Sequence, residues 1–225
     1  AAARRTWNDD LGRIRVEGGT EAQKKVFYTG LYHALIHPNV LSDVNGEYPA
    51  MESAEIRTAE GNRYTVFSLW DTYRNLHQLL TLVYPERQLE MVRSMVGMYR
   101  EWGWLPKWEL YGRETFTMEG DPSIPVIVDT WMKGLRDFDM DAAYEAMRKS
   151  ATTPGARNRM RPDIDPYIEK GYVPLGFYAR DLSGDNSVSH ALEYYIADHA
   201  LSLLADSLGK KDDAALFRAR SLGYK

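Results

Sequence analysis

Residues 67–74 hold the side chains best suited to binding a polar ligand, and they read Phe-Ser-Leu-Trp-Asp-Thr-Tyr-Arg. Trp70 and Asp71 are adjacent at the start of a predicted helix, and Arg74 lies one turn further on. An indole face could stack on a sugar ring while the carboxylate and the guanidinium bind its hydroxyl groups. A structural interpretation is equally open, because a carboxylate in a first turn favours the helix dipole and Arg74 could pair with it.

A second group combines tryptophans with carboxylates. Trp102, Trp104 and Trp108 fall within seven residues, and several acidic residues follow them: Glu109, Glu114, Glu119 and Asp121. Glycoside hydrolysis uses two carboxyl groups beside the sugar, one as an acid with a raised pKa and one as a base. Taken alone, the segment favours a simpler interpretation, a small aromatic core with solvated acids.

Histidine spacing gives a weaker indication of zinc. His33 and His37 are four residues apart, so on one helix they would face the same way. A zinc-protease helix has Glu after the first His, where this sequence has Ala34, and no third ligand stands out. A packed histidine and a helix-end histidine are therefore the preferred interpretation. Glu193 lies near a predicted helix start, where a capping or dipole role is the default.

Composition narrows the possible classes of function. The 225 residues include 28 Lys and Arg against 32 Asp and Glu, and 44% are hydrophobic, as in an ordinary globular protein. No basic stretch indicates a nucleic-acid partner, no apolar run approaches the roughly 20 residues of a membrane span, and residues 1–7 contain no signal-peptide core. The sequence has no cysteine and no P-loop, dinucleotide-binding or serine-hydrolase motif.

The apolar spacing is helical almost throughout, so the expected fold is all-α and built from antiparallel helical hairpins. Helices are expected at about residues 20–37, 68–83, 85–102, 122–134, from 139, 187–208 and 212–225. The signals are a capping box at Thr20–Gln23, caps at Asp139 and Asp212, and prolines and end glycines such as Gly103. Long loops are expected at residues 37–64, 104–121 and 161–185, with brief strand pairing near 63–67. One face of the helix expected over residues 187–208 carries Leu192, Tyr195, Ile196, His199 and Leu203.

An ordered set of motifs resembles glycoside hydrolase family 92, the calcium-dependent exo-acting α-mannosidases. No single motif is decisive, but together they follow the family's order and span nearly the whole chain. They are Phe27-Tyr-Thr-Gly-Leu-Tyr-His33, His37-Pro-Asn39, residues 64–74, Gly103-Trp-Leu-Pro106, Glu114-Thr115 with Met118 and Gly120, Gly171-Tyr-Val-Pro174, residues 188–194, and Arg220-Ser221 with Tyr224.

The resemblance implies hydrolysis of terminal α-linked mannose from glycans, with inversion and with the help of Ca²⁺. It implies that residues 1–225 form part of an (α/α)6 toroid of helical hairpins, the catalytic domain. The family's N-terminal β-sandwich and the C-terminal part of the toroid would then lie outside this chain. It also implies export by a bacterium to the periplasm or the outside.

Site residues follow from the same resemblance. Asp71 would hold mannose hydroxyls with support from Trp70 and Arg74, and further residues would line the same pocket: His33, Trp104 and Glu114. The family's general acid and base and most calcium ligands align beyond Lys225, so the catalytic and metal-binding residues remain unknown here. Glu114 is the best local candidate for an acid.

Two alternatives stay open at this stage. One is another α/α-toroid glycosidase, trehalase-like or glucosidase-like, and the other is a non-catalytic helical carbohydrate-binding module. A partial toroid should also leave apolar helix faces uncovered, because each hairpin expects a neighbour. The candidates for such exposure are Val26, Leu35, Leu216 and Leu222.

Overall fold

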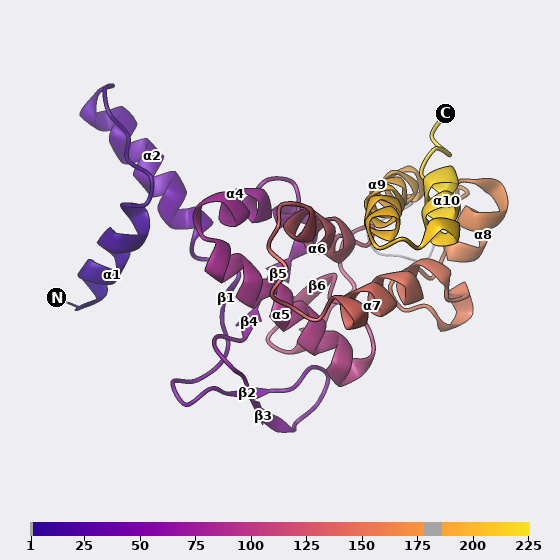
Figure 1. Ribbon diagram of the computed structural model, residues 1–225, viewed down its shortest axis with the longest axis horizontal. Coiled ribbons are helices and arrows are strands. Elements are labelled where there is room, and N and C mark those ends of the chain that lie inside the picture. The colour runs from indigo at the N-terminus through magenta and orange to yellow at the C-terminus, as the bar shows by residue number, and fades with distance from the viewer. Residues whose placement is uncertain (1, 178–185) are drawn as a thin grey trace.

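Helices make up most of the chain in a computed structural model that describes residues 2–177 and 186–225 (Figure 1). They are α1 (Ala2–Leu11), α2 (Glu21–Ala34), α3 (Leu69–Thr72), α4 (Leu76–Val83), α5 (Pro85–Trp102), α6 (Ser123–Met132), α7 (Met140–Thr152), the short 3-10 helix η1 (Gly155–Arg157), α8 (Ile164–Lys170), α9 (Ser187–Ser207) and α10 (Lys211–Arg220).

The described strands are all short and pair antiparallel. They are β1 (Asn39–Val40), β2 (Glu47–Pro49), β3 (Ile56–Thr58), β4 (Tyr64–Thr65), β5 (Phe67–Ser68), β6 (Trp108–Leu110) and β7 (Arg113–Glu114). β4 pairs with β1, so the expected brief pairing near residues 63–67 is confirmed. In the sheet β5-β6-β7, Glu109 lies opposite both Phe67 and Glu114, which joins the two segments singled out in the sequence.

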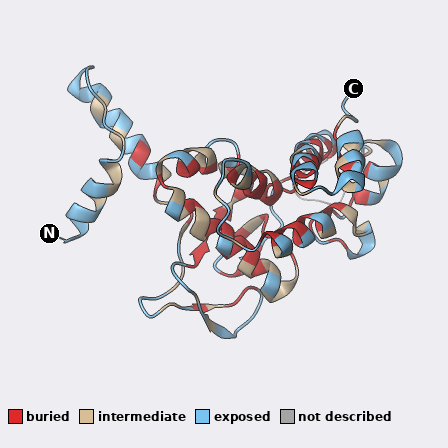
Figure 2. Ribbon diagram, in the orientation of Figure 1, coloured by how far each residue is buried: buried red, intermediate tan, exposed pale blue. Residues whose placement is uncertain are grey.

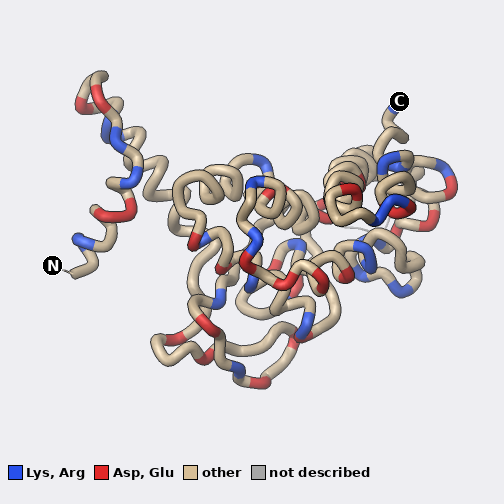
Figure 3. Tube along the Cα trace, viewed as in Figure 1, with Lys and Arg blue, Asp and Glu red and all other residues tan. Residues whose placement is uncertain are grey.

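Paired helices form the core, which confirms the expected helical-hairpin architecture. α4 packs against α5, α6 lies between α4 and α9, and α10 packs along α9. The buried residues concentrate in these central helices, whereas α1 and α2 extend from the body and are mostly exposed (Figure 2). Acidic and basic residues are interspersed along the described chain (Figure 3). No helix within residues 2–177 and 186–225 is both long and apolar enough to cross a membrane.

Three helix ends that the sequence marks clearly lie where they are predicted. The Thr20 hydroxyl accepts from Gln23 N–H while the Gln23 side chain accepts from Thr20 N–H, which confirms the capping box. Gly103 ends α5 at φ 92°, a conformation that glycine adopts without a Cβ clash. Asp139 caps α7 by accepting from Ala142 N–H.

Other boundaries differ from expectation. The helix expected over residues 68–83 is two helices, because Asn75 takes an extended φ of −156° between them. The last helix begins at Lys211, so Asp212 lies inside its first turn and does not cap it. α1 and α8 were not predicted. In α1 only Trp7 and Leu11 pack against the core, which is too short an apolar pattern for periodicity to reveal.

A buried ion pair anchors the long 37–64 loop on α5. Arg63 donates two hydrogen bonds to Glu101, at 3.0 and 2.8 Å, and both side chains are almost fully buried. Glu101 also accepts from the Tyr48 hydroxyl at 2.9 Å and from Met51 N–H at 2.7 Å. The loop is therefore fixed to the helix that leads to Trp104, although it contains little secondary structure.

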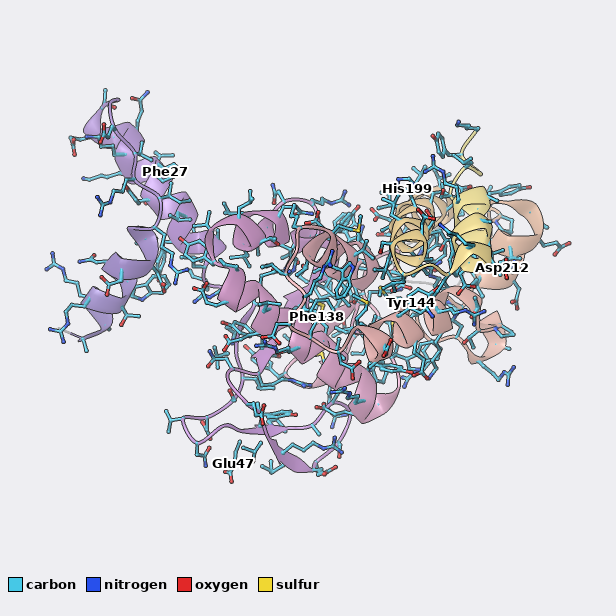
Figure 4. The ribbon with its side chains drawn as sticks, in the orientation of Figure 1. Phe27, Glu47, Phe138, Tyr144, His199 and Asp212 are labelled. Carbon is cyan, nitrogen blue, oxygen red and sulfur yellow. The ribbon has the colours of Figure 1, made fainter. Side chains whose placement is uncertain are left out.

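Some apolar helix faces are uncovered. Val26 is 74% exposed and Leu216 45% exposed, as expected, whereas Leu35 is buried in the core and that expectation is wrong. Leu222 is half-buried. The face of α9 that carries Leu192, Ile196 and His199 is also largely exposed. These residues line a groove of about 570 Å³ beside α10 (His199 is labelled in Figure 4).

Candidate active site

The turn from β5 into α3 presents Asp71 at the surface. Ser68 is the residue before the helix, and its hydroxyl hydrogen-bonds to the Asp71 carboxylate, which lies at the third helical position. Asp71 is exposed and lines a groove of about 480 Å³ together with Ala34 of α2 and Leu76 of α4. One carboxylate is thus held in place by a neighbour while it remains open to a ligand.

Arg74 contacts two aromatic rings. Its guanidinium carbon is 4.7 Å from the centroid of the Trp70 ring and 4.9 Å from that of Tyr73. It donates at 3.0 Å to Oε1 of Glu193 on α9, so the Arg74–Asp71 pair considered from the sequence is replaced by a long-range pair. The Arg74 side chain is still 47% exposed, which leaves N–H donors directed away from Glu193 for a ligand.

Glu193 does not have the capping or dipole role that the sequence predicts. It lies in the second turn of α9, beyond any capping position, and its side chain is only 10% exposed. Its Oε2 accepts from the Tyr73 hydroxyl at 2.7 Å, and burial together with this hydrogen bond raises the pKa of Tyr73. The sequence did contain a signal for this role, because Glu193 is a charged residue among apolar neighbours in a helix. A charged residue that is buried needs a partner.

The 115–121 loop packs directly on Glu193. Gly120 has φ 83°, and a Cβ there would lie 2.6 Å from the Glu193 Cβ, so only glycine fits. The next residue, Asp121, accepts at 2.9 Å from fully buried Arg161, which also donates at 2.8 Å to Asp198 on α9. These bonds fix the loop against the helix that carries Glu193.

The remaining predicted site residues are placed differently. Both Glu114 oxygens accept from backbone N–H groups, of Lys107 at 2.8 Å, Trp108 at 3.0 Å and Phe116 at 2.9 Å, which shapes this loop. Trp104 is only 8% exposed and lies under the Lys149 ammonium at 4.5 Å. His33 is exposed, next to Ala34 of the Asp71 groove. Their roles toward a sugar stay predictions.

No metal site is assembled within residues 2–177 and 186–225. There, no three His, Cys, Asp or Glu side chains lie close enough to hold an ion. α2 ends at Ala34, so His33 and His37 do not share a helical face, and the geometry assumed for a zinc pair is wrong. The residues present therefore do not fit a calcium ion by themselves.

Comparison with known proteins identifies the family of this chain. All of residues 1–225 match the model of the glycosyl hydrolase family 92 catalytic domain, and the chain belongs to that family. Membership favours this family over the trehalase-like and glucosidase-like toroids.

Two solved structures from Bacteroides thetaiotaomicron are similar over 99% of this chain. One is a family GH92 α-mannosidase, 36% identical with a TM-score of 0.88, which has also been solved in complex with mannoimidazole. The other is a family GH92 inverting mannosidase, 33% identical with a TM-score of 0.87. This chain spans 29% and 30% of their lengths.

A curated relative from the fungus Arthroderma benhamiae is described as an uncharacterized secreted glycosidase. It is 27% identical over 218 residues, which are 94% of this chain and 24% of the relative. The chain therefore spans between about a quarter and a third of the relatives it matches.

Proposed function

We propose that the protein hydrolyses terminal α-linked mannose from glycans with inversion, and that this chain supplies part of the mannose-binding pocket. The observation that carries the proposal is the half-exposed Arg74 guanidinium, positioned by Trp70, Tyr73 and Glu193, three residues after the exposed Asp71. A fixed carboxylate and a half-exposed guanidinium are suited to the vicinal hydroxyls of a sugar. The names of the Bacteroides relatives make mannose the sugar to test first.

Each residue has a distinct role in this proposal. The Asp71 carboxylate accepts from mannose hydroxyls, and the Arg74 N–H groups donate to mannose oxygens. Trp70 holds Arg74 in place, and Glu193 fixes its orientation from α9. His33, Trp104 and Glu114 line or shape the same pocket.

The bond-breaking groups are proposed to lie outside these 225 residues. In inversion, an acid protonates the glycosidic oxygen while a base takes a proton from the water that attacks the anomeric carbon on the opposite face. Glu114 is a poor choice for the acid, because both of its oxygens already accept from backbone N–H groups.

The wider assignments also belong to the proposal. Residues 1–225 would be one part of an α/α-toroid catalytic domain, and further helices would cover the open face of α9 and α10. Calcium dependence would require ligands outside the described residues, which do not form a site alone. Export is supported by the description of the Arthroderma relative as secreted.

The test is mannose release from α-linked mannobiose by the whole protein, in calcium and after treatment with EGTA. Release that EGTA abolishes supports the proposal, and release that EGTA leaves unchanged contradicts its calcium part. Glycan binding without any release would favour a non-catalytic carbohydrate-binding module instead.

A further inference from the structure

A chain of buried hydrogen bonds leads from the core to the turn that carries Asp71. It begins on α6, where the Thr130 hydroxyl donates to Val126 O at 2.7 Å, so its oxygen accepts from the Gln88 amide of α5 at 2.9 Å. The Gln88 carbonyl oxygen then faces Nδ1 of His77 on α4, also at 2.9 Å. Because a carbonyl oxygen can only accept, Nδ1 of His77 carries a proton. The chain thus crosses the place where α4, α5 and α6 pack together (Figure 1).

The other ring nitrogen of His77 reaches the turn itself. Burial favours the neutral ring, in which Nε2 can only accept, and Nε2 lies 3.0 Å from the Thr72 hydroxyl. Thr72 is the last residue of α3 and the direct neighbour of Asp71, and both residues line the same groove. The Thr72 hydroxyl therefore donates toward the core, and its partner is fixed by the rest of the chain.

α3 depends on such contacts for its orientation. It has only four residues, and a single turn has little stability of its own, because its first hydrogen bond must fix several backbone dihedral angles. Two consecutive side chains of α4 bond back across the break that separates the two helices. His77 accepts from Thr72, and Gln78 donates to the backbone oxygen of Tyr73 at 2.7 Å.

We propose that His77 is a positioning residue for the sugar, because its bond to Thr72 fixes α3 and with it the Asp71 carboxylate. His77 is only 1% exposed and therefore acts through the turn without touching the sugar. The inference rests on the proposed function, in which Asp71 accepts from mannose hydroxyls. If α3 without this bond keeps its orientation for about a fifth of the time, the apparent affinity for the sugar falls about fivefold.

Two substitutions separate the two ends of the imidazole. The amide nitrogen of asparagine takes roughly the place of Nδ1, whereas the amide group of glutamine reaches roughly that of Nε2. His77→Asn therefore keeps a donor for Gln88 and loses the bond to Thr72. His77→Gln keeps an acceptor for Thr72 and loses the bond to Gln88. Each variant loses one buried hydrogen bond, so both should lower the melting temperature by a similar amount.

Steady-state kinetics of the whole protein then distinguish positioning from stability. His77→Asn should raise KM for mannobiose about threefold to tenfold and leave kcat nearly unchanged, and His77→Gln should restore most of the lost affinity. Ser94→Ala is the matched control, because the buried Ser94 hydroxyl bonds to Tyr64 N–H at 2.9 Å and to Glu90 O at 2.8 Å, outside this chain of bonds. It should lower the melting temperature and leave KM unchanged.

Hydrogen exchange on the same proteins follows α3 without any turnover. Tyr73 N–H donates to Leu69 O at 2.9 Å, and exchange of this amide reports local opening of the turn. In a peptide that covers residues 69–75, His77→Asn should exchange about fivefold faster than His77→Gln. The two variants should exchange alike in α7, which is not part of the chain of bonds.

Three results would overturn the inference. They are equal KM values for His77→Asn and His77→Gln, equal exchange of α3 in these two variants, and a rise in KM with Ser94→Ala as large as that with His77→Asn. In the last case KM would follow stability alone. An unmodified protein that releases no mannose would contradict the proposed function, and the exchange comparison would still decide whether His77 positions α3.

Discussion

Arg74 and Glu193 are 119 residues apart in the sequence, and their side chains meet at 3.0 Å. Arg74 follows the one-turn helix α3, and Glu193 belongs to α9, so the pair joins α9 to the turn that carries Asp71. Glu193 is nearly buried while Arg74 is half-exposed. The carboxylate therefore acts as an internal support, and the guanidinium is the member of the pair that we propose to bind the sugar.

Replacing Arg74 should weaken substrate use more than it weakens the fold. Arg74→Ala removes charge-assisted donors to the sugar, so kcat/KM for mannobiose should fall about 10- to 100-fold. Arg74→Lys should recover only part of this loss, because an ammonium lacks the planar fork. Steady-state kinetics measure both variants.

Arg13→Ala is the matched control for Arg74. Arg13 also lies over a ring, 4.9 Å from the Tyr84 centroid, and pairs with a glutamate, but it is remote from α3 in the sequence. Kinetics of Arg74→Ala that match those of Arg13→Ala would show that Arg74 has no role in binding.

Variants at Ser68 and Asp71 should distinguish a positioning role from direct binding of the sugar. Asp71→Ala removes the proposed acceptor for mannose hydroxyls and should lower kcat/KM about 100-fold. Ser68→Ala removes only the hydrogen bond that orients Asp71, so its effect should be smaller, about tenfold, and seen in KM. Wild-type kinetics in Asp71→Ala would exclude this carboxylate from the pocket.

A buried histidine supports the same turn. His77 is enclosed between α4, α5 and α6, where Gln88 donates at 2.9 Å to the Thr130 hydroxyl and therefore accepts from His77 Nδ1–H at 2.9 Å. Nε2 then accepts at 3.0 Å from the hydroxyl of Thr72, the neighbour of Asp71. Burial lowers the pKa of His77 to about 4, while the hydrogen bond to Gln88 and the Asp129 charge oppose this shift.

This pKa shift should make stability depend on pH. The unfolded chain takes up a proton near pH 6.5, before the folded protein does, so stability contributed by neutral His77 is present above pH 6.5. It is lost as the pH falls toward about 4, and the total loss is about 3 kcal/mol. Urea unfolding at several pH values should show the decline, and His77→Gln should flatten it. An identical pH slope in wild type and His77→Gln would rule the explanation out.

The sequence predicted what local signals determine. Thr20 with Gln23, Gly103 and Asp139 each fix a helix end through bonds or conformations within a few residues, and all three behave as expected. Asp71 also lies in the first turn of α3, as predicted, because the preceding Ser68 marks the start. Family resemblance drew attention to the same turn.

Relationships between distant segments could not be predicted in this way. The partner of Arg74 depends on how α9 packs, and no spacing in residues 67–74 contains that information. The helix expected over residues 68–83 is broken at Asn75, where no Pro or Gly signals a helix end. The apolar period continues across the break, so the sequence pattern does not reveal it. The positive φ of 57° at Phe116 likewise cannot be predicted from the sequence.

The Arg63–Glu101 pair should be a major determinant of stability. Glu101→Ala leaves a buried guanidinium without its carboxylate and should cost about 3–5 kcal/mol in unfolding free energy. Glu21→Ala, which removes the exposed Lys24–Glu21 pair, should change stability very little. Chemical denaturation of both variants checks this, and similar small effects would mean that the buried pair is not the anchor of the 37–64 loop.

The most direct measurement of the central claim follows mannobiose hydrolysis by ¹H NMR, with the whole protein and its Arg74→Ala variant. The account predicts that β-mannose appears first, since inversion at an α-linkage yields the β-anomer, and that Arg74→Ala slows its appearance strongly. Initial release of α-mannose, no release at all, or unchanged release by Arg74→Ala would contradict it.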